Sequence, residues 1–228
     1  MKKLLIGILF VFLMGCTATH EAIVPADTSH NVKVTVIGKD VTDCDDNKWK
    51  LSTITKLGES MAIVQLYASL SSSDHVRMQR DLLWLEVFTD IRNILVTINS
   101  PGGDAFTGLS ISDLIRRYRA KGWTVNTHGS GIIASAAVPI FASGEERIAD
   151  QASIFMVHEA ALWKWPGRET ASDIAAQGSL MVLMREKYID ILMASSNLSE
   201  DEWLLMEAKT SWFSADRALE IGIVTRIE

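Results

Sequence analysis

The stretch Asn-Ile-Leu-Val-Thr-Ile-Asn-Ser-Pro-Gly-Gly at residues 93–103 decides the fold class of this chain. Its first seven residues form an apolar run rich in β-branched side chains, which predicts a buried strand. The Ser-Pro-Gly-Gly that follows ends the strand, because proline has no N–H to donate and glycine favours turns. Strand patterns and helical patterns alternate around this stretch, and the alternation predicts an α/β fold with a largely parallel sheet.

Apolar periodicity and turn residues predict the other elements. Further strands are expected at residues 32–37, 62–67, 123–127 and 153–158 and after Gly222, and the Gly-Ser-Gly of residues 129–131 predicts a loop. Helices are expected at residues 76–88, 111–118, 134–142, 171–193 and 215–219. Ser199 and Glu202 form a capping box for one more short helix, whereas residues 41–60 are polar and have no clear pattern.

The composition is that of an ordinary globular protein. The 228 residues are 48% apolar and 22% charged, which excludes disorder over the whole chain. The 22 Lys and Arg against 28 Asp and Glu give a net charge of −6, which disfavours nucleic-acid binding because phosphate contacts need clustered cations. The two cysteines lack metal-ligand spacing, so a disulfide scaffold and a zinc ribbon are both excluded.

The N-terminus has the pattern of a bacterial lipoprotein signal peptide. Met1-Lys2-Lys3 precedes an apolar run that ends at Met14, and this run is shorter than the roughly 20 residues that a transmembrane helix needs. Residues 13–16, Leu-Met-Gly-Cys, resemble the lipobox, whose cysteine becomes lipid-modified. We therefore expect a periplasmic protein anchored at Cys16 to the inner or outer membrane; the alternative is a plain secreted protein. Thr17 provides no inner-membrane retention signal.

Three parts of the chain follow from this interpretation. Residues 1–15 are a signal peptide, residues 16–45 are a tether and N-terminal segment, and residues 46–228 are one catalytic domain. Removal of Lys2 and Lys3 with the signal peptide changes the net charge from −6 to −8. Once Cys16 is acylated, Cys44 is the remaining thiol, and its aspartate neighbours disfavour a nucleophilic role because negative charge raises a thiol pKa.

Three separate features predict acyl-transfer chemistry. Glycine amides at the end of a strand let a substrate carbonyl approach backbone N–H groups closely. Ser135 lies where a glycine loop enters a helix, at a place where N–H groups favour negative charge. His158 ends an apolar strand, within reach of a neighbouring loop. A base beside a serine, with N–H donors facing an oxyanion, is the arrangement that acyl transfer needs.

The order and spacing of these features resemble the proteolytic subunit of the Clp protease, within the wider crotonase-like superfamily. The resemblance extends over residues 61–227. The motifs that carry it are residues 98–103 with Gly108 and Ile111, residues 131–136, residues 155–158, and residues 212–215 with Ala218 and Gly222. It implies a repeated ββα spiral with largely parallel sheets. It also implies a homo-oligomer in which the helix around residues 170–196 mediates subunit contact.

The resemblance implies a role for each matching residue. Ser135 corresponds to the nucleophile and His158 to the general base, while the N–H groups of Gly103 and Ala136 form the oxyanion hole. This scheme needs no cofactor and no metal. Thr210 stands where the family has the aspartate of the triad. Three alternatives stay open: a Ser–His pair with Thr210 as a neutral orienter, a substitute acid such as Glu207 or Asp201, or an inactive enzyme.

The expected location separates this chain from the cytoplasmic Clp system. No ATP is available outside the inner membrane and no phosphate-binding loop motif is present, so we expect an ATP-independent peptidase without an ATPase partner, acting on peptides or unfolded segments. Residues 163–167 are either a substrate-groove insertion or a surface loop. Two other functions compete with the peptidase: an inactive scaffold that oligomerises or binds peptides, and an acyl-CoA hydratase or isomerase using Asp104 and Glu159.

Overall fold

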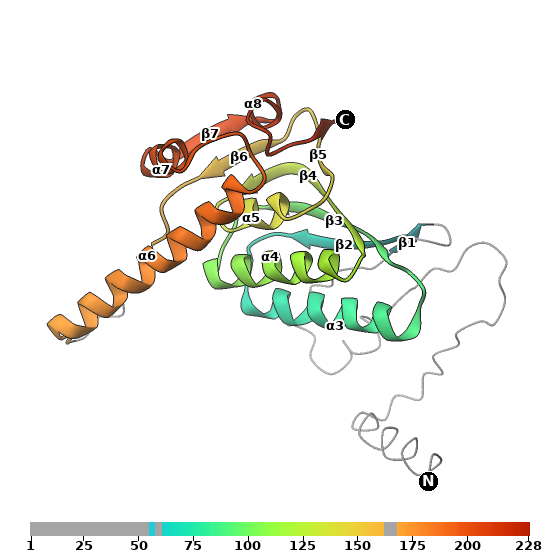
Figure 1. Ribbon diagram of the computed structural model, residues 1–228, viewed down its shortest axis with the longest axis horizontal. Helices are drawn as coiled ribbons and strands as arrows, with labels where there is room; N and C mark the ends of the chain where they lie inside the picture. Colours follow the sequence, from blue (N-terminus) through green and yellow to red (C-terminus); the bar gives the residue numbers. More distant parts are fainter. Residues whose placement is uncertain (1–54, 58–60, 162–167) are drawn as a thin grey trace, which may run out of the picture.

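The computed structural model describes residues 55–57, 61–161 and 168–228 (Figure 1). Several predictions fall outside these residues: the signal peptide, lipidation of Cys16, the tether, the strand at residues 32–37, the role of Cys44 and the segment at residues 163–167. They stay predictions. In the described part of the chain, no helix is long and apolar enough to cross a membrane.

The described strands form one sheet, in which β1, β2, β3, β4, β5 and β8 are successive neighbours. A branch of the sheet begins at β4, which also pairs with β6, and β6 in turn pairs with β7. The strands are β1 (Thr55–Leu57), β2 (Met61–Tyr67), β3 (Asn93–Ser100), β4 (Thr124–Ala134), β5 (Arg147–Ala149), β6 (Ile154–Val157), β7 (Ser211–Ser214) and β8 (Arg226–Ile227). All pairs are parallel except β1 with β2 and β6 with β7, so the predicted α/β fold with a largely parallel sheet is confirmed.

Helices cover one face of this sheet and also extend beyond it. They are α3 (Ser72–Phe88), α4 (Ala105–Ala120), α5 (Ala137–Ala142), α6 (Ala171–Met193), α7 (Glu200–Ala208) and α8 (Ala215–Glu220). Figure 1 shows α3 and α4 side by side, and it shows α6 projecting away from the body of the molecule. Alternate residues of β2 and β3 are buried, which places one face of each strand in the core, as period-two side chains require.

Two helix predictions match the structure closely. Helix α6 has the predicted bounds, and Thr170 with Asp173 caps its N-terminus. The predicted capping box of α7 is present, because Glu202 Oε2 accepts a hydrogen bond from the Ser199 N–H at 2.8 Å. Both caps satisfy N–H groups that the first helical turn leaves without intrahelical partners.

The predictions around residues 123–142 were partly wrong. A strand, a loop at residues 129–131 and a helix from residue 134 were expected, but β4 continues through the glycines to Ala134 and α5 begins at Ala137. The strand continues because its first half pairs with β3 and β5 and its second half pairs with β6. Gly131 adopts a φ of 77° at this change of partners, so the glycine bends the strand without ending it.

Candidate active site

Ser135 occupies the sharp connection between β4 and α5. Its φ is 53°, in the left-handed region that non-glycine residues rarely adopt. Its N–H donates to the Met156 carbonyl of β6 at 2.8 Å, and its carbonyl accepts a hydrogen bond from the Tyr188 hydroxyl of α6 at 3.3 Å. The backbone of this half-buried serine is therefore held from two elements far away in the sequence.

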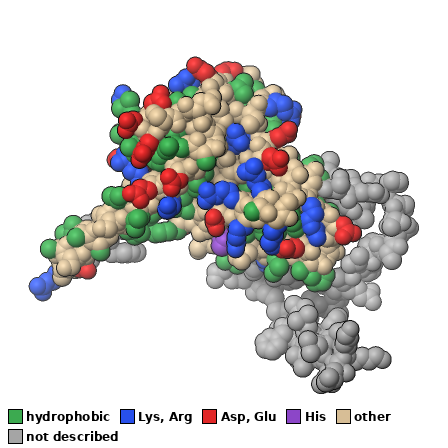
Figure 2. Space-filling model, in the orientation of Figure 1, with side chains coloured by type: hydrophobic (Ala, Val, Ile, Leu, Met, Phe, Trp, Pro, Cys, Tyr) green, Lys and Arg blue, Asp and Glu red, His purple; other side chains and the backbone are tan. Residues whose placement is uncertain are grey.

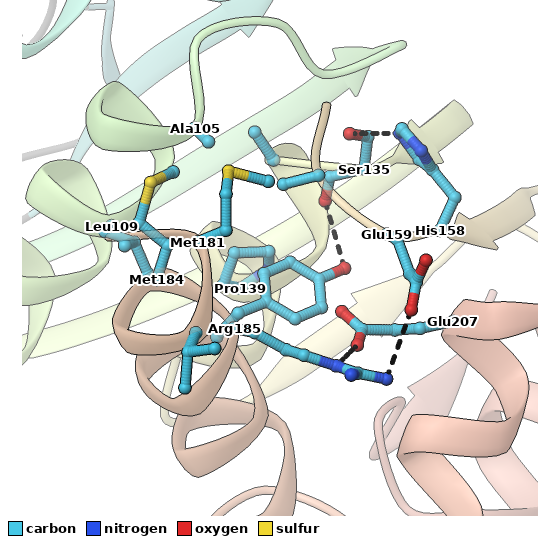
Figure 3. A pocket seen from close by; sticks show the side chains of 14 residues that line it. Ala105, Leu109, Ser135, Pro139, His158, Glu159, Met181, Met184, Arg185 and Glu207 are labelled. Atoms are coloured by element: carbon cyan, nitrogen blue, oxygen red, sulfur yellow. Dashed lines mark hydrogen bonds and ion pairs between the residues drawn. The ribbon is translucent and has the colours of Figure 1, made fainter. Parts of the chain in front are cut away.

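His158 follows directly after β6 and faces this serine. The parallel pairing of Ala134 with Met156 brings the ends of β4 and β6 to the same edge of the sheet. His158 Nε2 lies 2.8 Å from Ser135 Oγ (Figure 3). This distance is that of a hydrogen bond, and it allows the imidazole to take the hydroxyl proton.

The turn after β3 packs against the Ser135 backbone. Gly102 adopts a φ of 91°, and a Cβ at this position would lie 2.7 Å from Ser135 Cβ and 2.9 Å from the Ala136 nitrogen. The Leu70 N–H donates to the Gly102 carbonyl at 2.8 Å and so fixes the turn. Within the described part of the chain, no hydrogen-bond acceptor engages the N–H of Gly103 or of Ala136. Both donors are thus available to a ligand beside Ser135.

Thr210 lies close to His158 in the fold but does not bond to it. The antiparallel register pairs Val157 with Ser211, so Thr210, one residue earlier, comes opposite His158. Thr210 is exposed at a φ of 50°, and between described residues no hydrogen bond joins it to His158. No contact therefore supports the hypothesis that Thr210 orients His158 as an uncharged group.

The two substitute acids lie in different surroundings on α7. Asp201 is exposed in the first turn of this helix. Glu207 is buried, with 3% of its surface exposed, and its carboxylate accepts a hydrogen bond from Arg185 Nε at 3.0 Å. No hydrogen bond from His158 to either acid is present among the described residues. As observed, the site consists of a serine–histidine pair.

A cavity of about 210 Å³ opens beside Ser135 and His158. Figure 3 shows Leu109, Met181 and Met184 gathered at one side of it, with Ser135 and His158 at the other. Pro139 lies between the two sides, and Arg185, Glu159 and Glu207 form a charged end. Tyr188 also lines the cavity. Burial raises the pKa of the Tyr188 hydroxyl, so this group stays protonated and remains a donor to Ser135.

Three charged side chains form a network at that end. Arg185 Nε forms an ion pair with Glu207. A terminal guanidinium nitrogen of Arg185 lies 3.4 Å from Glu159 Oε1. Burial raises the pKa of Glu207, an effect that the neighbouring Arg185 opposes by favouring the charged form. The sequence named Glu207 only as a substitute acid and Tyr188 only as part of a helix face, and it gave no role to Arg185. Arg185 and Tyr188 lie three residues apart on the predicted helix, which places them on one face, but periodicity does not show what that face meets.

A second group of serine, histidine and aspartate lies on β4 and directly after β5. His128 Nε2 is 2.8 Å from Asp150 Oδ1, and Ser130 also bonds to Asp150. These bonds lower the pKa of Asp150. Because Ser130 bonds to the carboxylate and not to the imidazole, this group lacks the serine–base contact found at Ser135.

A comparison with known families identifies the chain. The model of the Clp protease family matches residues 47–228. The chain belongs to the Clp protease family. The match covers well over half of the sequence and includes every described residue of the site.

Individual Clp relatives are similar over most of their length. The chain is 28% identical to the ATP-dependent Clp protease proteolytic subunit 2 of Treponema denticola over 153 residues, covering 66% of this chain and 74% of the relative. It is 29% identical to the subunit 2 of Gluconobacter oxydans over 188 residues, covering 80% and 82%. Among solved structures, a mutant of ClpP1 from Listeria monocytogenes has a TM-score of 0.62 at 25% identity, covering 73% of this chain and 90% of that one.

Proposed function

We propose that this chain is a serine peptidase that works through Ser135 and His158, without an orienting carboxylate. The observation that carries the proposal is the 2.8 Å contact between Ser135 Oγ and His158 Nε2, beside two backbone donors without partners among the described residues. Membership of the Clp protease family supports the same activity.

The geometry supports a two-step acyl transfer. His158 Nε2 accepts the proton of Ser135 Oγ as that oxygen attacks the substrate carbonyl. The oxyanion that forms is stabilised by the N–H groups of Gly103 and Ala136. His158 then gives the proton to the leaving amine, and a water molecule, activated by the same imidazole, hydrolyses the acyl-enzyme. Thr210 is uncharged and cannot stabilise the imidazolium electrostatically, so we expect slow turnover.

We further propose that the enzyme acts in the bacterial envelope on peptides or unfolded segments, without ATP. The support is the signal-peptide pattern that ends at Cys16, since ATP is not supplied outside the inner membrane.

The competing scaffold hypothesis predicts the same fold without chemistry at Ser135. The hydratase hypothesis loses support, because Asp104 caps α4 by accepting from the Thr107 N–H and Glu159 pairs with Arg185.

Labelling with a fluorophosphonate probe tests the peptidase directly. The Ser135 Oγ should bond to phosphorus as fluoride leaves, and mass spectrometry should locate the adduct on Ser135 of the wild-type protein. Labelling should disappear in Ser135→Ala and His158→Ala. It should persist in Ser130→Ala, because Ser130 lies on β4, the strand before Ser135, and has a histidine nearby. A folded protein that stays unlabelled between about pH 6 and pH 9 would leave the scaffold as the better hypothesis.

Self-association through α6 is the remaining part of the proposal. Apolar side chains on the projecting half of this helix are exposed, which is unusual for a helix without a partner (Figure 2). They include Ile174, Val182 and Leu183. Because the chain belongs to the Clp protease family, we propose that a second copy of the chain covers these side chains.

The charge substitution Leu183→Glu should therefore shift the protein from oligomer to monomer in analytical ultracentrifugation. The physical reason is that burying an uncompensated carboxylate in an interface is costly. Leu205→Glu on α7 is the matched control, since Leu205 and Leu183 are 54% and 55% exposed. An unchanged oligomer in Leu183→Glu would show that α6 is not the interface.

A further inference from the structure

The cavity beside Ser135 has two chemically different ends. Its walls are aliphatic: Leu109, Pro139, Met181 and Met184 come from three helices and contribute no charge. Another part of its lining contains the carboxylates of Glu159 and Glu207 with the guanidinium of Arg185, and Figure 3 shows Glu159 next to His158. A side chain that enters beside Ser135 therefore meets apolar surface and charged groups in the same cavity. This inference rests on the proposed peptidase function.

The charged end has more negative than positive groups. Two carboxylates share one guanidinium, so one negative charge is left over when all three groups are ionised. Arg185 contacts Glu207 through its Nε and Glu159 through a terminal nitrogen, and both contacts reduce its ability to attract another anion. The cavity as built is thus suited to a cation or a hydrogen-bond donor.

Glu207 has an oxygen available for that donor. In the described part of the chain, Arg185 is the hydrogen-bond partner of the Glu207 carboxylate, and it uses Oε2. Oε1 has no partner there, although Glu207 is only 3% exposed and lines the cavity. A carboxylate oxygen on a cavity wall can accept a hydrogen bond from a bound ammonium group, and the opposite charges strengthen that bond.

We propose that this cavity receives the substrate side chain on the acyl side of the scissile bond, and that it selects lysine there. The methylene stem of lysine would pack along the apolar walls, as such stems do on apolar surfaces. Its ammonium would reach Oε1 of Glu207, with Glu159 adding further negative potential. A carboxylate at the end of an otherwise apolar specificity pocket is the device by which some serine proteases select basic side chains.

Peptidyl diphenyl phosphonates that differ only at this residue test the proposal. Ser135 Oγ bonds to phosphorus and phenoxide leaves, so the labelling rate reports recognition even when turnover is slow. Lysine and norleucine form a matched pair, because their stems are alike and only lysine has the ammonium. We expect the lysine probe to react about 10- to 100-fold faster at neutral pH, the range for one charge-assisted hydrogen bond.

A variant then assigns the preference to Glu207. Glu207→Gln keeps an oxygen that can accept from Arg185 Nε but removes the charge, so the lysine-to-norleucine rate ratio should fall toward one. Asp201→Asn removes a carboxylate from the same helix at an exposed position, and it should leave both rates unchanged. Circular dichroism of the variants separates a loss of preference from a loss of fold.

Three results would overturn the proposal, and each leaves the peptidase function open to separate judgement. A norleucine probe that reacts as fast as the lysine probe would show an apolar pocket. A faster glutamate probe would show that Arg185 binds the substrate in place of Glu159. A lysine preference that Glu207→Gln does not reduce would place the recognition elsewhere. If the fluorophosphonate also fails to label Ser135, the proposed function itself has failed.

Discussion

Replacing Thr210 with aspartate is expected to raise kcat for peptide hydrolysis by about 10²- to 10⁴-fold, the scale on which an orienting carboxylate acts in serine proteases. The β6–β7 register places residue 210 opposite His158. A carboxylate there would accept the Nδ1–H, hold the imidazole in the tautomer that keeps Nε2 free for Ser135, and stabilise the imidazolium. The backbone also favours the change, because aspartate adopts a φ of 50° more readily than the β-branched threonine.

Thr210→Asn is the matched control for this gain of activity. Asparagine has the shape of aspartate and tolerates the same φ, but it carries no charge. We expect the highest kcat with aspartate at residue 210 and lower values with asparagine and threonine. Equal kcat values for the aspartate and asparagine variants would mean that residue 210 does not orient His158.

Gly102→Ala is expected to lower kcat by about 10²- to 10³-fold, the loss seen when an oxyanion donor is displaced. An added Cβ would lie 2.7 Å from the Ala134 carbonyl oxygen and 2.9 Å from the Ala136 nitrogen. Since these are backbone atoms, relief requires the turn to move away from Ser135. The Gly103 and Ala136 donors would then no longer converge on one point. Steady-state hydrolysis of a peptide substrate measures the loss.

Gly122→Ala separates this steric effect from backbone strain. Gly122 has a φ of 86°, close to the 91° of Gly102, but a Cβ there meets nothing within 4 Å. Both variants therefore carry a similar conformational cost, of roughly 1–2 kcal/mol, and should lose similar thermal stability from it. Only Gly102→Ala should lose activity at a temperature where both are folded. Comparable activity losses in the two variants would trace the effect to strain alone.

Sequence patterns predicted the helices and strands whose apolar spacing or capping residues lie within the element itself. The 171–193 helix and the capping box of α7 were found because apolar spacing and caps are local features. The course of β4 was mispredicted because its glycines resemble a loop, and only its partners β3, β5 and β6 show why the strand continues. Strand β7 was missed for a similar reason: its four residues form a strand only because β6 lies alongside.

The candidate site was predictable from motif order but not in its details. The spacing of Ser135 and His158 in the sequence does not show that their side chains meet, and pairing between β4 and β6 brings them to 2.8 Å. The role of Arg185 in the cavity depends on how α6 packs against α7 and on the position of Glu207, which is a tertiary property. Thr210 was identified by alignment to a motif, and the structure adds its register and its missing contact.

The left-handed backbone of Ser135 has a consequence for how this chain could evolve. A non-glycine residue at a φ of 53° costs the fold about 1 kcal/mol, and such costs persist mainly where function requires them. Glycine would remove the cost in a single replacement and make the protein more stable. A lineage under selection for stability alone would therefore tend to lose the hydroxyl. The Ser135 hydroxyl is retained at a strained position, where it is hydrogen-bonded to His158. The chain is therefore less stable than it would be with glycine, and it keeps a reactive group.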